Sequence, residues 1–101
     1  MNNPPTPTDL LLSLQRALLG EVHVDLRAVS IESDTAGKTV MMRFEYSSEP
    51  RGDARKCGSR IAASVFADLP DDWALEDEHL ARPLPTRCQP LEHLAYRRYE
   101  G

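Results

Sequence analysis

An alternating pattern in residues 38–46 constrains the fold more than any other feature of the sequence. Val40, Met42, Phe44 and Tyr46 stand at every second position, and the residues between them are mostly polar. A period of two is typical of a β-strand that buries one face. Residues 27–33 alternate in the same way, and the polar segment between the two runs, which contains a glycine, suits a hairpin loop. We therefore predict a β-hairpin, whose apolar face other elements must cover because an isolated hairpin is marginally stable in water.

Residues 9–19 form the first candidate for that cover. Leucines recur there at three- and four-residue spacing, and Gly20 follows, a residue type that often ends helices. We predict a helix over this range, capped at its start by Thr8 or Asp9. Its apolar stripe is wide and also includes Leu12 and Leu19. The helix is therefore expected to cover a sheet face and to retain apolar surface for a partner.

Residues 53–68 form the second candidate, with Asp53 expected as its cap. Its predicted apolar face consists of Ala54, Cys57, Ile61, Ala62, Val65, Phe66 and Leu69. Gly58 interrupts the segment and costs about 1 kcal/mol relative to alanine inside a helix. That cost is tolerable if position 58 packs closely on the sheet.

Two further strands complete the predicted fold, over residues 73–82 and 94–99. The element order is then α-β-β-α-β-β. We expect an α+β, two-layer sandwich with a four-stranded, mostly antiparallel sheet and both helices on one face. The predicted core consists of Leu14, Leu18, Val29, Ile31, Val40, Met42, Phe44, Ile61 and Val65.

The length of 101 residues suits one domain with one core, which we place at residues 9–101. Residues 1–8 hold three prolines without an apolar pattern and are expected to form a disordered N-terminal arm. The longest apolar runs fall far short of the roughly 20 residues of a membrane helix, and the N-terminus lacks the layout of a signal peptide. We expect a cytoplasmic protein that does not engage membranes.

The charge balance argues against nucleic acid as a partner. The formal net charge is −4, whereas phosphate binding needs an excess of clustered Lys and Arg. Four arginines near the C-terminus alternate with tyrosines that would be able to stack on bases: Arg82, Arg87, Arg97 and Arg98 with Tyr96 and Tyr99. Given the overall acidity, we interpret them instead as charges that keep an edge strand from pairing with another sheet.

Enzyme chemistry finds little support in the sequence. Cys57 or Cys88 is able in principle to pair with a histidine as a nucleophile, but Cys57 falls on the apolar side of its predicted helix. Cys88 and His93 lack the paired spacing of a zinc motif. No phosphate-binding glycine loop or nucleophile elbow is present in the sequence. We expect no catalytic residues, no cofactor and no metal.

One dense group of carboxylates lies within eleven consecutive positions: Asp68, Asp71, Asp72, Glu76, Asp77 and Glu78. Such a group can be a solvated strand edge, a catalytic pair, or a docking face. A catalytic pair needs a buried member with a raised pKa, and nothing in the sequence indicates one. A docking face would steer a positively charged protein toward the chain. We take these six residues as the candidate partner-binding residues, against the simpler interpretation of a solvated edge.

Three stretches carry a resemblance to a known class of proteins: residues 14–22 (LQRALLGEV), 26–29 (LRAV) and 67–70 (ADLP), the last followed by an acidic strand. They resemble small bacterial toxin-immunity proteins of the contact-dependent inhibition or colicin type. The resemblance implies a cytoplasmic, non-enzymatic protein that neutralises a toxin domain by binding it. We expect the protein to be a monomer or homodimer. It assigns no functional residue.

Two alternatives remain beside this hypothesis. The first is a small domain that self-associates through its sheet and acts as a scaffold. The second is a small thiol- or metal-dependent enzyme.

Overall fold

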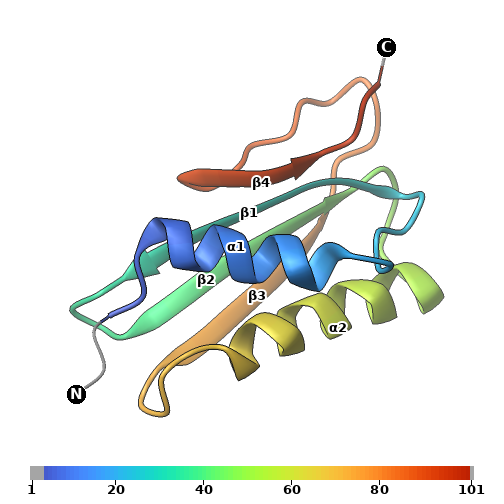
Figure 1. Ribbon diagram of the computed structural model, residues 1–101. Helices are drawn as coiled ribbons and strands as arrows, with labels where there is room; N and C mark the ends of the chain where they lie inside the picture. Colours follow the sequence, from blue (N-terminus) through green and yellow to red (C-terminus); the bar gives the residue numbers. More distant parts are fainter. Residues whose placement is uncertain (1–3, 101) are drawn as a thin grey trace.

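The computed structural model describes residues 4–100 and shows a four-stranded sheet with both helices on one face (Figure 1). The elements are α1 (Pro7–Leu18), β1 (Leu26–Asp34), β2 (Thr39–Tyr46), α2 (Gly52–Ala67), β3 (Ala74–Ala81) and β4 (His93–Arg97). The strands lie in the order β3-β2-β1-β4. The predicted α+β class, element order and placement of the helices are therefore confirmed.

The connections explain why the sheet is mixed. The predicted hairpin is present, with β1 antiparallel to β2 and Val29 opposite Phe44. α2 returns the chain to the end of the sheet where β2 began, so that β3 pairs with β2 in parallel. β4 is antiparallel to β1 on the other margin. Two of the three strand pairs are thus antiparallel, which confirms a mostly antiparallel sheet.

The core lies between the helices and the sheet. All nine residues predicted for it are buried, and the same cluster includes further side chains that the prediction omitted: Leu10, Ala17, Leu26, Tyr46, Ala54, Ala62 and Trp73. Alternation in β2 sends Val40, Met42, Phe44 and Tyr46 toward the helices, as predicted. Neither of the two described helices combines the length and apolarity that a membrane span requires.

Helix α1 begins earlier than predicted. Its cap is Thr6, whose hydroxyl accepts from the Asp9 backbone N–H while the Asp9 carboxylate accepts from the Thr6 N–H. This reciprocal pair is a capping box, and Pro7 suits the first helical position. The prediction of Thr8 or Asp9 as the cap was wrong. Pro7 and Thr8, which we assigned to the arm, are helical, and residues 1–3 of that arm lie outside the described residues.

Helix α2 differs from its prediction in its cap and in its register. The N-cap is Arg51, which forms no side-chain capping bond, and Asp53 lies in the first turn. Gly58 is buried, whereas Cys57 is only half-buried and Phe66 keeps 53% of its surface exposed. The predicted apolar face was therefore too wide. The last two strands also differ by one or two residues at their ends, a common uncertainty at fraying termini.

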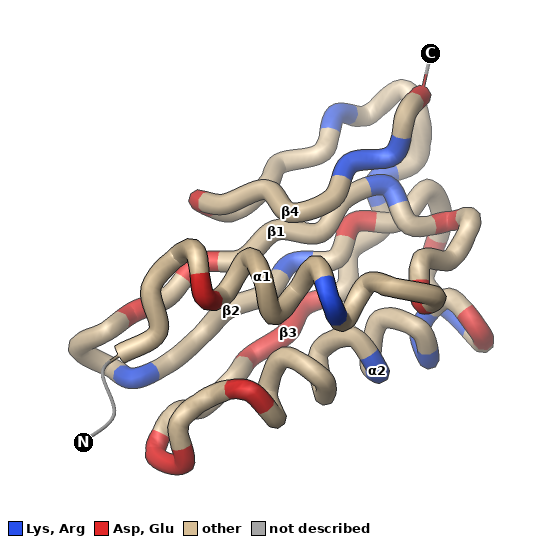
Figure 2. Tube along the Cα trace, in the orientation of Figure 1, with Lys and Arg blue, Asp and Glu red and all other residues tan. Residues whose placement is uncertain are grey.

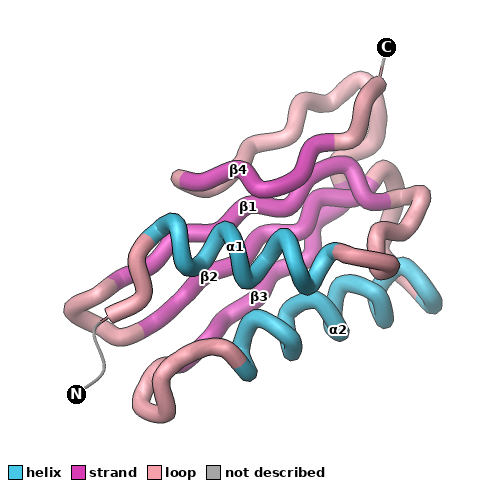
Figure 3. Tube along the Cα trace, in the orientation of Figure 1, coloured by secondary structure: helices cyan, strands magenta, loops and turns pink. Residues whose placement is uncertain are grey.

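The sheet face away from the helices is partly covered by residues 82–92, the long loop that links the two margins of the sheet (Figure 3). Glu45 lies under it with no exposed surface. Its Oε2 accepts from Arg82 Nε at 3.1 Å and from the Gln89 backbone N–H at 2.7 Å, while Oε1 has no hydrogen-bond partner among residues 4–100. The Leu91 N–H donates to the buried Ser30 hydroxyl at 2.8 Å. These polar bonds hold the loop against the sheet.

A buried cation joins this loop to the end of the chain. Arg27 is 5% exposed and donates to both carboxylate oxygens of Glu100, at 2.7 and 2.8 Å, and to the Arg82 and Thr86 carbonyls. The hydrogen bond from Arg27, assisted by Arg98, lowers the pKa of Glu100 to about 2, from an ordinary value of 4.5. The Glu100 carboxylate therefore neutralises the charge of the buried Arg27 side chain.

We expect this pair to make stability depend on pH in the acid range. Because the pKa of Glu100 is lower in the folded state, its contribution is complete above pH 4.5 and is lost as the pH falls toward 2. Glu100→Gln should lower the free energy of unfolding at pH 7 and make its decline below pH 4.5 shallower, as measured by urea unfolding. Glu49→Gln, at an exposed position, is the control. Parallel pH curves for Glu100→Gln and the wild type would contradict this account.

Candidate functional site

The acidic segment occupies one margin of the sheet and the turn that leads to it. Asp68 is the C-cap of α2, Asp71 and Asp72 lie in the following turn, and Glu76, Asp77 and Glu78 lie in β3. In Figure 2 the acidic segments run along β3 and the turn before it, whereas basic segments gather near β4 and the loop before it. The two margins of the sheet therefore carry opposite charge.

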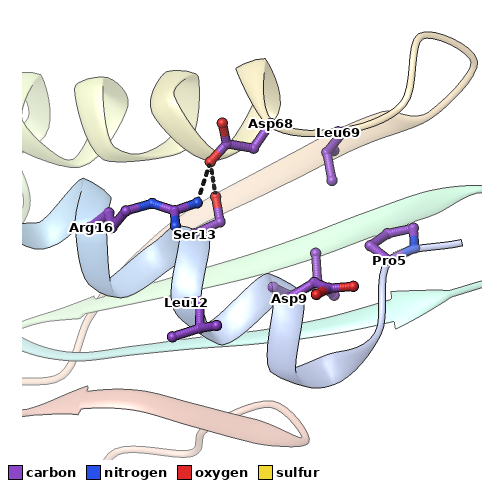
Figure 4. A pocket seen from close by; sticks show the side chains of 8 residues that line it. Pro5, Asp9, Leu12, Ser13, Arg16, Asp68 and Leu69 are labelled. Atoms are coloured by element: carbon purple, nitrogen blue, oxygen red, sulfur yellow. Dashed lines mark hydrogen bonds and ion pairs between the residues drawn. The ribbon is translucent and has the colours of Figure 1, made fainter. Parts of the chain in front are cut away.

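Asp68 links the two helices. Its Oδ2 accepts from the Ser13 hydroxyl at 2.6 Å and from Arg16 Nη2 at 3.4 Å, and both of these residues belong to α1 (Figure 4). The shallow pocket beside this contact is also lined by Leu12 and Leu69. Asp68 thus stabilises the packing of α1 against the end of α2, in addition to any contact with a partner.

Two other carboxylates pair with β2 or with the hairpin loop before it. Asp72 accepts from Lys38, and Glu78 accepts from Arg43. The bond from Lys38 lowers the pKa of Asp72, so this group stays ionised in mildly acidic solution. Both pairs are partly exposed and are worth little to stability, but they reduce the negative charge that a partner meets.

Asp77 is exposed, and it joins a polar chain beneath α2 whose buried members are His79 and Tyr46. Its Oδ2 lies 2.6 Å from His79 Nε2, and His79 Nδ1 lies 2.8 Å from the Tyr46 hydroxyl. Burial lowers the pKa of His79, although the bond to Asp77 opposes the shift, and burial raises the pKa of Tyr46. The imidazole is therefore neutral at pH 7, with Nε2 beside both the Asp77 carboxylate and Arg55 Nη1, which lies 2.9 Å away, and with Nδ1 beside the Tyr46 hydroxyl.

Gly58 makes room for that chain. A Cβ at this position would lie 2.3 Å from the Tyr46 hydroxyl and 2.9 Å from His79 Cε1. Position 58 therefore packs closely on the sheet, which is the condition under which a glycine in this helix is tolerable. The His79 ring also stacks on Phe44, with ring centroids 4.6 Å apart. With a side chain only 4% exposed, His79 supports the fold and does not reach solvent.

Asp71 and Glu76 have no ion-pair partner among residues 4–100. Register places Glu76 beside Met41, which is opposite Glu32, so Glu76 and Glu32 lie on the same face of the sheet. Together with Asp34, they line a shallow depression near the end of the hairpin. Sequence reasoning missed Glu32 and Asp34, although the alternation of the predicted hairpin would place Glu32 on the face away from the core.

The six predicted carboxylates therefore do not form one continuous face. Alternation in β3 places Asp77 on the helix side of the sheet, and Glu76 and Glu78 on the other side. Asp68 points toward α1. The turn that holds Asp71 and Asp72 leads into β3, the outermost strand on this side, so these residues and the β3 carboxylates lie at the same margin of the sheet.

The cysteines have different settings, and neither is fully buried. Cys57 Sγ lies 3.3 Å from Arg60 Nη2 on the surface of α2. Burial raises the pKa of the Cys88 thiol, and the nearby Glu45 charge adds to the effect, which keeps the thiol protonated at pH 7. Among residues 4–100, no group of three or more potential ligands is arranged to hold a metal ion.

A comparison with protein families decides what kind of protein carries this surface. The family model described as MafI2 immunity protein matches residues 7–100, nearly the whole chain. The chain belongs to the MafI2 immunity protein family. The resemblance to toxin-immunity proteins is thereby confirmed, and the match spans every helix and strand of the fold. The comparison with curated proteins gave no match.

Proposed function

We propose that this MafI2-family chain neutralises a cognate toxin by binding it directly and stoichiometrically, without catalysis. Membership in an immunity protein family is the observation that carries the proposal. The chemistry of the candidate groups supports a binding role, because His79 is neutral and buried and the Cys88 thiol is protonated. A nucleophile or general base would need an accessible group with a pKa suited to its task.

The proposed contact is the acidic margin, formed by Asp68, Asp71, Asp72, Glu76, Asp77 and Glu78, and the proposed partner surface is basic. Asp71 and Glu76 contribute most to the attraction. Internal cations offset the charges of Asp68, Asp72 and Glu78, and Asp77 is bonded to His79 beside the Arg55 guanidinium. The electrostatic field of such an acidic surface raises the rate of encounter with a basic partner more than it raises the affinity.

We expect Asp71→Asn/Glu76→Gln to slow association with the cognate toxin domain. At low salt the association rate constant should fall about three- to tenfold, since charge complementarity accelerates encounter. The difference should shrink as the Debye length shortens from about 30 Å at 0.01 M salt to about 8 Å at 0.15 M. Stopped-flow binding across this salt range measures both effects.

The matched control is Glu49→Gln/Glu92→Gln, which removes the same charge at two exposed positions outside the acidic margin. It should change the association rate less than twofold. Equal association rate constants for the two double variants would show that the net charge of the chain, and not the position of the carboxylates, sets the association rate. If the association rate constant of Asp71→Asn/Glu76→Gln and its dependence on salt are the same as in wild type, the acidic margin is a solvated strand edge and not a docking face.

A further inference from the structure

The outer edge of β3 has no strand beside it among residues 4–100. The Ala74 N–H donates to the Lys38 carbonyl at 2.9 Å and the Arg82 N–H to the Tyr46 carbonyl at 2.7 Å, so even-numbered residues turn their backbone groups toward β2. In a parallel ladder the alternate residues face the other way. The backbone groups of Leu75, Asp77, His79 and Ala81 therefore point outward, where another strand would be able to pair with them.

The opposite edge of the sheet is protected. β4 has five residues, its register shifts opposite Val29 and Ser30, and Gln15 Nε2 donates to the Ala95 carbonyl at 2.6 Å. Short length, a bulge and a covering side chain are devices that prevent edge pairing. β3 has eight residues paired with β2 in an unbroken register and contains no proline. The two edges thus differ in their readiness to accept a strand.

Helix α2 provides a surface for the side chains of an added strand. A groove between α2 and β3 is lined by Arg55, Ser59, Ala63, Phe66, Leu75 and Asp77. Phe66 is 53% exposed there. Because a neighbouring strand lies about 4.8 Å away and alternates its side chains, every second residue of an added strand would face this groove.

The charge of the edge restricts what can bind. Residues 67–81 contain no lysine or arginine, and β3 carries three consecutive carboxylates, Glu76, Asp77 and Glu78. Pairing β3 with β3 of a second copy would bring these like charges together, which is unfavourable. A strand that bears lysine or arginine would instead find opposite charges on both faces of the sheet.

We propose that the toxin contributes an extended segment, bearing lysine or arginine and at least one apolar residue, which pairs with the outer edge of β3 and packs against Phe66. This inference rests on the proposed function. It specifies backbone pairing as the mode of recognition, which side-chain charge alone does not require.

Amide hydrogen exchange followed by NMR, with and without the cognate toxin domain, tests the proposal. In the free chain, the amides of Glu76, Glu78 and Leu80 should be protected, and those of Leu75, Asp77 and His79 should exchange at least tenfold faster. In the complex the second group should slow by at least tenfold. If the toxin binds and these amides do not change, this inference is wrong and the proposed function stands. If no binding occurs, the proposed function itself fails.

A pair of variants at one position isolates the outward backbone group. Leu75→Pro removes an outward N–H, which an edge strand tolerates, and Leu75→Ala removes the side chain alone. We expect the proline variant to bind the toxin domain at least tenfold more weakly than the alanine variant, with both still folding cooperatively. Equal affinities would overturn the proposal. So would a homodimer in size-exclusion chromatography whose outward β3 amides are already protected without toxin.

Discussion

Replacing Val65 by aspartate should abolish the cooperative unfolding transition of this chain. Val65 has no exposed surface and lies in the core cluster between α2 and the sheet. A carboxylate there would lose its hydration without gaining a cation, a cost of several kcal/mol against a total stability of about 5–15 kcal/mol. Circular dichroism during urea or thermal unfolding measures the loss.

The neighbouring residue provides the control. Ser64 is exposed on the same helix, so Ser64→Asp introduces the same charge into water. That variant should retain a cooperative transition within about 0.5 kcal/mol of wild type. A Val65→Asp protein that stays soluble and melts cooperatively at the wild-type midpoint would contradict the core assignment.

Gly58→Ala should destabilise the fold, although alanine favours helices by about 1 kcal/mol relative to glycine. The new Cβ would lie 2.3 Å from the Tyr46 hydroxyl, so the ring has to move and the bond to His79 is broken. Overpacking costs about 1–3 kcal/mol, and a buried group left without its partner costs about 1–3 kcal/mol more. We expect a net loss of about 1–5 kcal/mol in urea unfolding, after the helix gain is subtracted.

A double variant tests that cause. Tyr46→Phe removes the hydroxyl that the Cβ would meet, so Gly58→Ala should cost much less in the Tyr46→Phe background than in wild type. The free energies of unfolding of the four proteins form a double-mutant cycle. Additive effects would show that the hydroxyl is not the obstacle.

The hairpin and the helices were predictable because their signals are local. Alternation in β2 and the three- and four-residue spacing of leucines in α1 each report one buried face. The cap at Thr6 was also readable, since Thr6 and Asp9 have the spacing of a capping box. We placed the start of the helix too late because the three prolines in residues 1–8 suggested a disordered arm. Pro7 in fact suits the first turn of the helix.

The burial of Glu45 was not predictable from its neighbours. It alternates with Phe44 and Tyr46, so the pattern assigns it to the face away from the core, which is correct. The pattern cannot show that residues 82–92 fold back over that face and supply Arg82 and the Gln89 N–H as partners. Similarly, the half-exposed position of Cys57 depends on how α2 rotates so that Gly58 can approach Tyr46.

The arrangement of the acidic margin was also not predictable from local sequence patterns. Proximity in the sequence suggested a docking face, and strand alternation divides Glu76 and Asp77 between two sides of the sheet. The ion pairs with Lys38 and Arg43 join residues more than thirty positions apart and follow only from the parallel pairing of β2 and β3. The surface offered to a partner therefore had to be read from the structure.

The most direct test of the central claim is a titration of the purified cognate toxin domain with the purified chain while the toxic activity is measured. A binding immunity protein should abolish the activity with a sharp end point at one molecule per toxin domain, and the complex should migrate as a single species. Inactivation by a small fraction of an equivalent would indicate catalysis. Full toxin activity in the presence of excess folded chain would contradict the account.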